Sequence, residues 1–206
     1  MEKGNTKQEI LEAALDLFST QGFEATSVSQ IADAVGIRKA SLYSHFARKQ
    51  EILESLMTQV LEQYNKHSIF IHTDWDNAAF AEAKQNLSAE EVEQLVFTQI
   101  RYILHDPLVS KVRKMLTIEQ FRNAQMAELQ TKQNYTNVMK YFTNLMRFFI
   151  QRGKLKDGDA EIMAAQLCLP VSVWINLCDR EPEREDEVIE LVGRHIRQFF
   201  EMYKEQ

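Results

Sequence analysis

The sequence predicts an all-α protein, and three kinds of observation support this. Apolar residues recur every three to four positions along most of the 206 residues, which is the period of an amphipathic helix. The chain holds only three prolines and six glycines, so few positions interrupt helices. Capping residues stand where the periodic segments begin and end. The predicted architecture is an N-terminal helix-turn-helix unit of three helices, joined by a long helix to a larger helical domain, with about nine helices in all.

The first fifty residues predict one helix followed by a helix-turn-helix motif. The first helix, over about residues 6–21, has one apolar stripe and ends at Gly22. Ser27 offers an N-cap oxygen to a second helix that runs to Val35. Gly36 suits the left-handed conformation that ends this helix, and a third helix follows over about residues 39–46. Two short helices joined by a tight turn with glycine are typical of a motif that presents its second helix to the major groove of DNA.

Positive charge is concentrated in this motif. Residues 34–50 contain no Asp or Glu, whereas they contain the four cations Arg38, Lys39, Arg48 and Lys49. Residues 1–50 are neutral in sum, and the net charge of −6 belongs to residues 51–206. A cationic patch on an acidic chain favours contact with phosphate groups. A plain pair of helices with solvated basic side chains is the alternative interpretation.

The motif contains Thr26, Ile31, Ala32, Gly36, Ile37, Ser41, Leu42, Tyr43, His45, Phe46 and Lys49. Through these residues it resembles the N-terminal region of the TetR family of bacterial regulators over about residues 6–65. One position departs from the family pattern, because Arg38 stands where a small hydroxyl residue usually caps the recognition helix. We therefore expect a cap that is weaker or supplied by another group, and Arg38 becomes a candidate for a phosphate contact.

The resemblance implies a sequence-specific DNA-binding transcriptional regulator, and in the first instance a homodimeric repressor of a palindromic operator in double-stranded DNA. Lys39 and Ser41, at the start of the recognition helix, are expected at base edges. Tyr43 and His45 are expected near phosphates, as is Lys49 at the start of the next helix. The expected DNA-binding residues are Ser27, Ser29, Gln30, Arg38, Lys39, Ser41, Tyr43, His45 and Lys49.

The middle of the chain predicts further helices with recognisable ends. A fourth helix begins at Arg48 and continues to about residue 64 without Pro or Gly, so it links the motif to the rest as a rigid element. Residues 68–87 are the least regular stretch, with a short helix expected near residues 76–84. Further helices are expected over residues 88–105, which begin with the capping box Ser88-Ala-Glu-Glu91, over residues 107–121 and over residues 123–152, with Gly153 as the last C-cap.

The last two predicted helices are more apolar than the core of one chain requires. One, opened by Asp157 or Asp159, spans residues 162–178; with Pro170 inside, these 17 residues are too few for a membrane span. The other spans about residues 183–203. A second copy would complete a four-helix bundle, as the family resemblance also implies; a monomer that buries both helices is the alternative. The expected dimer residues are Cys168, Val171, Trp174, Ile175, Val188, Val192, His195, Ile196 and Phe199.

The resemblance further implies a cavity for a small-molecule effector, apolar or amphipathic, in the C-terminal part. The expected division is a DNA-binding domain over residues 1–47 and an effector-binding and dimerisation domain over residues 48–206. Ordinary core packing competes with ligand contact at each candidate, and a DNA-bound protein-interaction factor without a ligand is the competing function. The candidates are Trp75, Phe97, Arg101, Tyr102, Met115, Glu119, Phe121, Tyr135, Phe142 and Trp174.

Catalytic and metal-binding motifs are missing from the sequence. The five histidines lack the spacing of a zinc site, and there is neither a glycine-rich phosphate loop nor a nucleophile elbow. Cys168 and Cys178 lie ten residues apart on one predicted helix, about 15 Å along its axis, which is too far for a disulfide. The N-terminus shows no signal peptide. We therefore expect a cytoplasmic protein that is not an enzyme and needs no cofactor, metal or membrane.

Overall fold

The structure is a computed structural model that describes residues 3–67, 70 and 87–205. All regular secondary structure in these residues is helical, and the all-α prediction with an N-terminal helix-turn-helix is confirmed. The described residues include one isolated β-bridge, between Leu155 and Lys204. Trp75 and the short helix expected near residues 76–84 lie outside the described residues.

The chain forms two compact units, and each unit contains two separate stretches of sequence. Unit 1 comprises Met1–His67 and His105–Gln130, and unit 2 comprises Ser68–Leu104 and Thr131–Gln206. This division differs from the predicted boundary after residue 47, because Ile52 and Leu56 of the fourth helix and Met115 of a later helix are buried in one cluster with N-terminal residues. The functional division into residues 1–47 and 48–206 stays a prediction.

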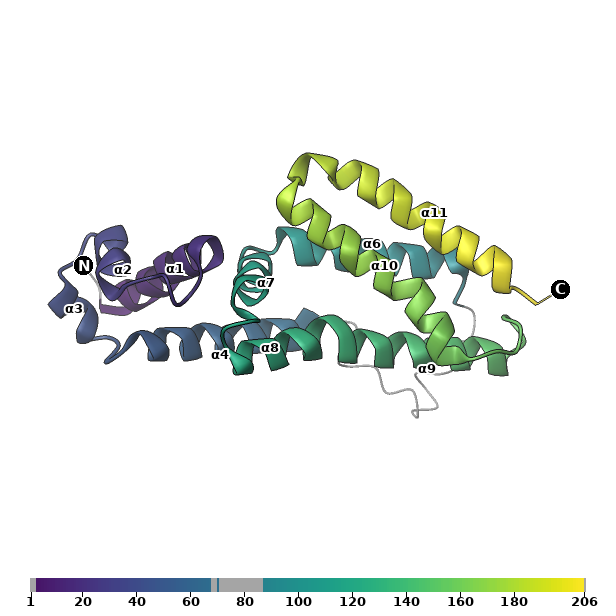
Figure 1. The fold of residues 1–206 in the computed structure, drawn as a ribbon, viewed down its shortest axis with the longest axis horizontal. Coiled ribbons are helices and arrows are strands. Elements are labelled where there is room, and N and C mark those ends of the chain that lie inside the picture. Colours follow the sequence, from purple (N-terminus) through teal and green to yellow (C-terminus); the bar gives the residue numbers. More distant parts are fainter. Residues whose placement is uncertain (1–2, 68–69, 71–86, 206) are drawn as a thin grey trace. The chain divides into compact units, whose positions relative to one another are not determined.

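Unit 1 is organised around its first helix. One face of this helix supplies Ile10, Ala14 and Phe18, all completely buried. Ile31 and Leu42 from the helix-turn-helix pack into the same core, which α4 and α7 complete. The two short helices of the motif lie beside α1 in Figure 1. The helices of unit 1 are α1 (Lys3–Gln21), α2 (Val28–Val35), α3 (Lys39–Tyr43), α4 (Lys49–His67), α7 (Pro107–Glu119) and α8 (Ala124–Thr131), whose last residue belongs to unit 2.

The ends of α2 follow the predicted capping chemistry. The Gln30 amide N–H donates to Ser27 Oγ at 3.2 Å, and the Ser27 N–H donates to Gln30 Oε1 at 2.8 Å, which forms a capping box. Gly36 has φ +76°, and the Ile37 N–H donates to the Ala32 carbonyl at 3.0 Å, so a left-handed residue closes the helix. The next helix, α3, ends at Tyr43 and is shorter than the predicted 39–46.

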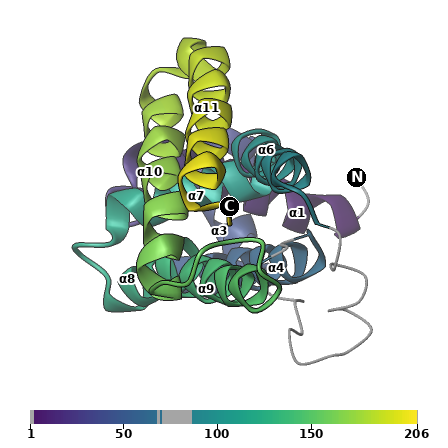
Figure 2. The same cartoon turned by 90° about the vertical axis from the view of Figure 1, so that its right-hand side faces the viewer.

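Unit 2 is a group of long helices around an aromatic and aliphatic core. Helix α10 packs against α9 on one side and against α11 on the other, and Figure 2 shows α10 and α11 side by side. The helix predicted over residues 123–152 is present as α8, a π-helical turn (Lys132–Thr136) and α9 (Asn137–Gln151) in direct succession. The other helical segments are α6 (Ala89–His105), α10 (Ala160–Arg180), a 3₁₀ turn (Pro182–Arg184) and α11 (Glu185–Tyr203).

Helix α10 is longer than predicted. The argument that it has too few residues to span a membrane therefore does not hold. It has 21 residues, and its most apolar window has a mean hydropathy of 1.4, so by length and composition it is the one helix in the described part of the chain able to cross a membrane. A core helix of a soluble protein meets the same criteria. About a third of that window (33%) is buried, with Leu167, Cys168 and Val171 packed among residues of α9 and α11.

The two cysteines are free and buried, as expected for small apolar core residues. Burial raises the pKa of the Cys168 thiol to about 12, which keeps it protonated at neutral pH. Its Sγ lies 3.7 Å from Met139 Sδ on α9. Cys168 therefore contributes to packing inside unit 2.

The capping box of α2 generates the first prediction. Substitution Ser27→Ala removes the oxygen that accepts the Gln30 N–H, and we expect it to lower the free energy of unfolding by about 1 kcal/mol. Substitution Ser29→Ala, two residues further along the same helix, is the matched control and should change stability by less than about 0.5 kcal/mol. Thermal and urea unfolding of both variants measure the difference. Equal stabilities would show that the box does not stabilise α2.

Candidate nucleic-acid interface

Helix α3 is anchored by one side and presents the other to solvent. Leu42 is completely buried in the core of unit 1, and Phe46, just beyond the helix, is 3% exposed. Because Leu42 points inward, Lys39 and Ser41 on the outer side of this short helix are exposed, and Tyr43 is 45% exposed. The predicted base-contacting side chains of α3 are thus accessible together.

Arg38 and Lys39 form the basic pair of this surface. Arg38 occupies the N-cap position of α3 and its side chain makes no capping hydrogen bond, as the sequence predicts. Neither residue forms an ion pair within the part of the chain that the structure describes, and both are exposed. Two uncompensated positive charges therefore stand at the start of α3, where phosphates or base edges are within reach of a recognition helix.

Lys49 makes several contacts within unit 1. Its ammonium donates to the carbonyls of Phe23 at 2.6 Å and Thr26 at 2.8 Å, with Glu24 O at 3.4 Å, and lies 4.2 Å from the centre of the Phe23 ring. These acceptors use the three hydrogens of the ammonium group. Lys49 therefore holds the segment between α1 and α2, and its predicted contact with phosphate stays a prediction.

The remaining basic residue of the patch and the other predicted DNA-binding residues make different contacts. Arg48 pairs with Glu51 at 3.6 Å, so its charge is partly balanced. The side chains of Ser27 and Gln30 are joined in the capping box of α2. Ser29 and His45 are half-buried. The cationic patch expected from four residues is thereby reduced to Arg38 and Lys39, and DNA contact by the remaining residues stays a prediction.

The residues predicted to line an effector cavity are distributed over both units. In unit 1, Met115 is completely buried in the core and Phe121 is 90% exposed, so ordinary packing describes the first and solvent surrounds the second. In unit 2, Phe142 is a core residue and Trp174 packs on His195 at a ring distance of 5.3 Å. Phe97, Arg101, Tyr102 and Tyr135 are half-buried or exposed in unit 2, and their contact with an effector stays a prediction.

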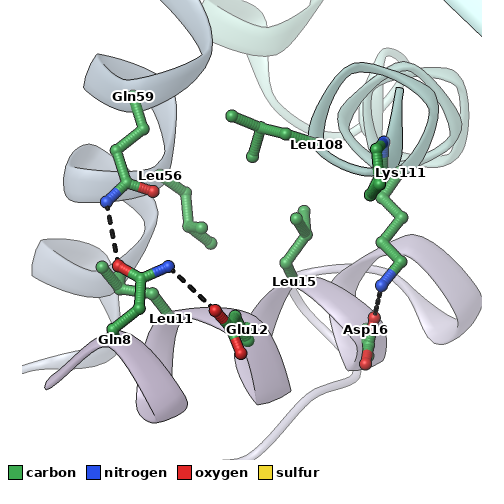
Figure 3. A pocket seen from close by; sticks show the side chains of 10 residues that line it. Gln8, Leu11, Glu12, Leu15, Asp16, Leu56, Gln59, Leu108 and Lys111 are labelled. Carbon is green, nitrogen blue, oxygen red and sulfur yellow. Dashed lines mark hydrogen bonds and ion pairs between the residues drawn. The ribbon is translucent and has the colours of Figure 1, made fainter. Parts of the chain in front are cut away.

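A surface pocket of about 330 Å³ lies in unit 1, lined by α1, α4 and the start of α7. Leu11, Leu15, Leu56 and Leu108 form its floor, and Figure 3 shows polar side chains around them, with Lys111 paired to Asp16. Three of the leucines are at most 5% exposed. A ligand would gain little from covering them, because apolar stabilisation scales with the area removed from water.

The residues predicted for the dimer contact lie mostly inside the protomer. Six of them are in the core of unit 2, namely Cys168, Val171, Val188, Val192, Ile196 and Phe199, so their side chains are not available to a second copy. Trp174, Ile175 and His195 are half-buried. His195 Nε2 donates to the Leu167 carbonyl at 3.0 Å within the same chain. The large apolar residues of α10 that are more than half exposed are Ile162, at 55%, and Val173, at 63%.

The described residues contain no group of three or more His, Cys, Asp and Glu side chains placed to hold a metal ion. The short helix α3, anchored by the buried Leu42 and with two exposed cations at its start, defines the class of this unit: a helix-turn-helix of the kind that binds DNA.

Comparison with known proteins agrees with this class. Residues 10–56 match the family model described as bacterial regulatory proteins, tetR family. The chain is 33% identical over 92 residues to the HTH-type transcriptional repressor KstR2 of Rhodococcus jostii, a match that covers 44% of this chain and only 45% of that relative. It is 26% identical over 205 residues to the "Probable HTH-type transcriptional regulator YttP" of Bacillus subtilis, covering 99% of this chain and 91% of that protein.

The fold is also shared with a solved structure. A TetR family transcriptional regulator from Pseudomonas syringae superposes with a TM-score of 0.63 at 18% identity, covering 98% of this chain and 99% of that one. The family model over residues 10–56, the relatives and this fold all make the chain similar to TetR-family regulators. The relatives are regulators rather than enzymes.

Two features of unit 1 are not predicted from the sequence. Glu119 is completely buried and its Oε1 accepts from the Glu24 N–H at 3.4 Å, and Lys49 binds the carbonyls of the same turn. The local signal for Glu119 is a charged residue within an apolar helical stripe, and from the sequence it is predicted only as a candidate for ligand contact. The signal for the turn is Gly22, which was interpreted only as a helix end.

The contacts of Lys49 generate the second prediction. Substitution Lys49→Ala removes charge-assisted hydrogen bonds to the α1–α2 segment and should lower the free energy of unfolding by about 2 kcal/mol. Substitution Arg48→Ala removes a neighbouring cation that forms only an exposed ion pair, and should cost about 0.5 kcal/mol or less. Urea unfolding measures both. A Lys49 variant as stable as the Arg48 variant would contradict the structural role.

Proposed function

We propose that the protein is a homodimeric transcriptional repressor that binds a palindromic operator in double-stranded DNA and is released by a small effector. The observation that supports DNA contact is the exposed pair Arg38 and Lys39 at the start of α3, in a motif whose anchor Leu42 is buried. Two such helices in a dimer would read two half-sites about one helical turn, ~34 Å, apart. A single motif would bind too weakly to specify a site.

The proposed dimer contact is the outer face of α10 together with the neighbouring side of α11. Ile162 and Val173 are large apolar residues left more than half exposed, and only a third of the apolar window of α10 is buried in one chain. A second copy that covers this face would remove that apolar area from water. The residues earlier predicted for this contact, such as Ile196 and Phe199, would support it from inside the core.

The effector part of the proposal rests on the similarity to the TetR family. TetR-family regulators bind small molecules as well as DNA, and we propose that this chain takes an apolar or amphipathic compound in its C-terminal part, without a metal or other cofactor. As a DNA-binding regulator it would work in the cytoplasm. Effector binding should also be reciprocal: a compound that weakens operator binding by some factor must itself bind more weakly, by the same factor, when operator is present.

The third prediction concerns DNA contact. On a duplex enriched by wild-type protein from a random library, substitutions Arg38→Ala and Lys39→Ala should each flatten the slope of log affinity against log salt by about one unit. Ser41→Ala should change the preferred sequence instead. Arg147→Ala, an exposed cation on α9, is the control and should leave the slope unchanged. Slopes that stay at the wild-type value in both basic variants would remove Arg38 and Lys39 from the interface.

The fourth prediction concerns the dimer. Substitution Val173→Glu places a charge on the outer face of α10 without touching the core, so a folded monomer is expected in sedimentation, with operator affinity lost. Leu61→Glu puts the same charge on a 38% exposed apolar position of α4 and should leave the sedimentation coefficient unchanged. Circular dichroism checks that both variants keep their helices. A Val173→Glu protein that sediments as the wild type does would place the contact elsewhere.

A further inference from the structure

We propose that Glu119 is a positioning residue that acts as a latch on the turn between α1 and α2. We call residues 22–26 the α1–α2 turn. In the closed state Glu119, the last residue of α7, contacts this turn. In the open state its carboxylate is exposed to water. The balance between the states would set how firmly α2 and α3 are held. The consequence for DNA rests on the proposed function, whereas the latch itself does not.

The contact between Glu119 and the turn is close and depends on a glycine. Glu119 is completely buried and its Oε1 accepts from the Glu24 N–H at 3.4 Å. A Cβ atom at residue 22 would lie 2.4 Å from Glu119 Oε1 and 3.0 Å from Ile118 Cγ2. Gly22 also has φ +91°, which other residues rarely adopt. Glycine at this position is therefore what allows the end of α7 to approach.

The opposite side of the turn is held by hydrogen bonds within the same unit. Lys49 binds the carbonyls of Phe23 and Thr26, and Thr26 Oγ1 donates to the Gly22 carbonyl at 2.7 Å. The next residue, Ser27, is the N-cap of α2. A movement of the turn must therefore shift the start of α2, and α7 is connected to the helix-turn-helix through these few residues.

The charge of Glu119 opposes the closed state. Its Oε2 is buried and has no hydrogen-bond partner in the part of the chain that the structure describes, and the amide that Oε1 accepts is at the long limit of a hydrogen bond. A carboxylate removed from water without a cation costs free energy. Packing of α7 against α1 favours closure, since Met115 and Leu116 are buried in the shared core. The cost of burying the carboxylate and the gain from packing α7 on α1 oppose each other, so the contact between Glu119 and the turn is able to open.

An exposed contact elsewhere on α7 provides a comparison. Lys111 pairs with Asp16 of α1 at the rim of the pocket in Figure 3, with side chains 40% and 59% exposed. Opening this ion pair exposes no buried charge, and exposed pairs contribute little. The latch is therefore assigned to Glu119 and not to α7 as a whole.

Hydrogen exchange of the full chain tests the latch without DNA. Substitution Glu119→Gln keeps the shape of the side chain and an acceptor for the Glu24 N–H but removes the charge. The backbone amides of the α1–α2 turn should then exchange at least about fivefold more slowly than in the wild type. Glu119→Met, of similar size without polar atoms, should also slow the exchange of Ala25 and Thr26. Gly22→Ala should accelerate it. Gly153→Ala imposes the same left-handed strain at φ +63° with nothing within 4 Å, and Lys111→Ala removes the exposed pair; both should leave the turn unchanged.

The outcomes are distinct from those of the proposed function. Unchanged or faster exchange in folded Glu119→Gln, or unchanged exchange in Gly22→Ala, would overturn the latch. On a duplex enriched from a random library, Glu119→Gln should bind at least about threefold more tightly than the wild type, with the same slope of log affinity against log salt. The reason is that a helix-turn-helix that is already held in place loses less conformational freedom when it binds DNA. If the wild type enriches no duplex, the proposed function fails, and hydrogen exchange still decides for or against the latch.

Discussion

Burial of one face of α1 is the interaction on which unit 1 depends. Ile10, Ala14 and Phe18 are completely buried, and full burial of each large apolar side chain contributes about 1.5–3 kcal/mol. Helices of 8 and 5 residues, the lengths of α2 and α3, are far below the roughly 12–15 residues at which an isolated helix becomes marginally stable in water. The helix-turn-helix therefore exists because Ile31 and Leu42 pack against α1, and its geometry follows from that packing.

The same dependence explains the distribution of charge on the proposed DNA-binding surface. Lys49 is the first residue of α4, where the helix dipole disfavours a cation. Its ammonium lies there because the fold brings the carbonyls of Phe23 and Thr26 to it, so the position stabilises unit 1. Arg38 and Lys39 have no such acceptors among the described residues, and their charges stay in solvent. A surface of two cations and two hydroxyl-bearing side chains, Ser41 and Tyr43, is more compact than the patch expected from composition.

Unit 2 shows how one apolar helix serves two purposes. The side of α10 that carries Leu167 and Cys168 closes the core, whereas Ile162 and Val173 remain on the outside. The hydrophobic content of α10 and α11 is thus greater than one chain buries, which is the basis of the proposed dimer. The division between the two sides depends on how α10 is rotated against α9 and α11, so residues such as Val192 and Ile196, taken from the sequence as contact residues, belong to the protomer's own core.

The sequence by itself indicated where most helices begin and that a helix-turn-helix is present, because the signals for these, the capping residues and the apolar period, lie within about four positions of one another. Ser27 with Gln30, Ser88 with Glu91 and the left-handed Gly36 are all of this kind. Only the tertiary structure decided the roles of Lys49 and Glu119. Lys49 meets the Phe23 carbonyl across 26 residues, and Glu119 meets the Glu24 amide across 95. Contacts over such separations follow from the packing of α1, α4 and α7 together, which no local pattern contains.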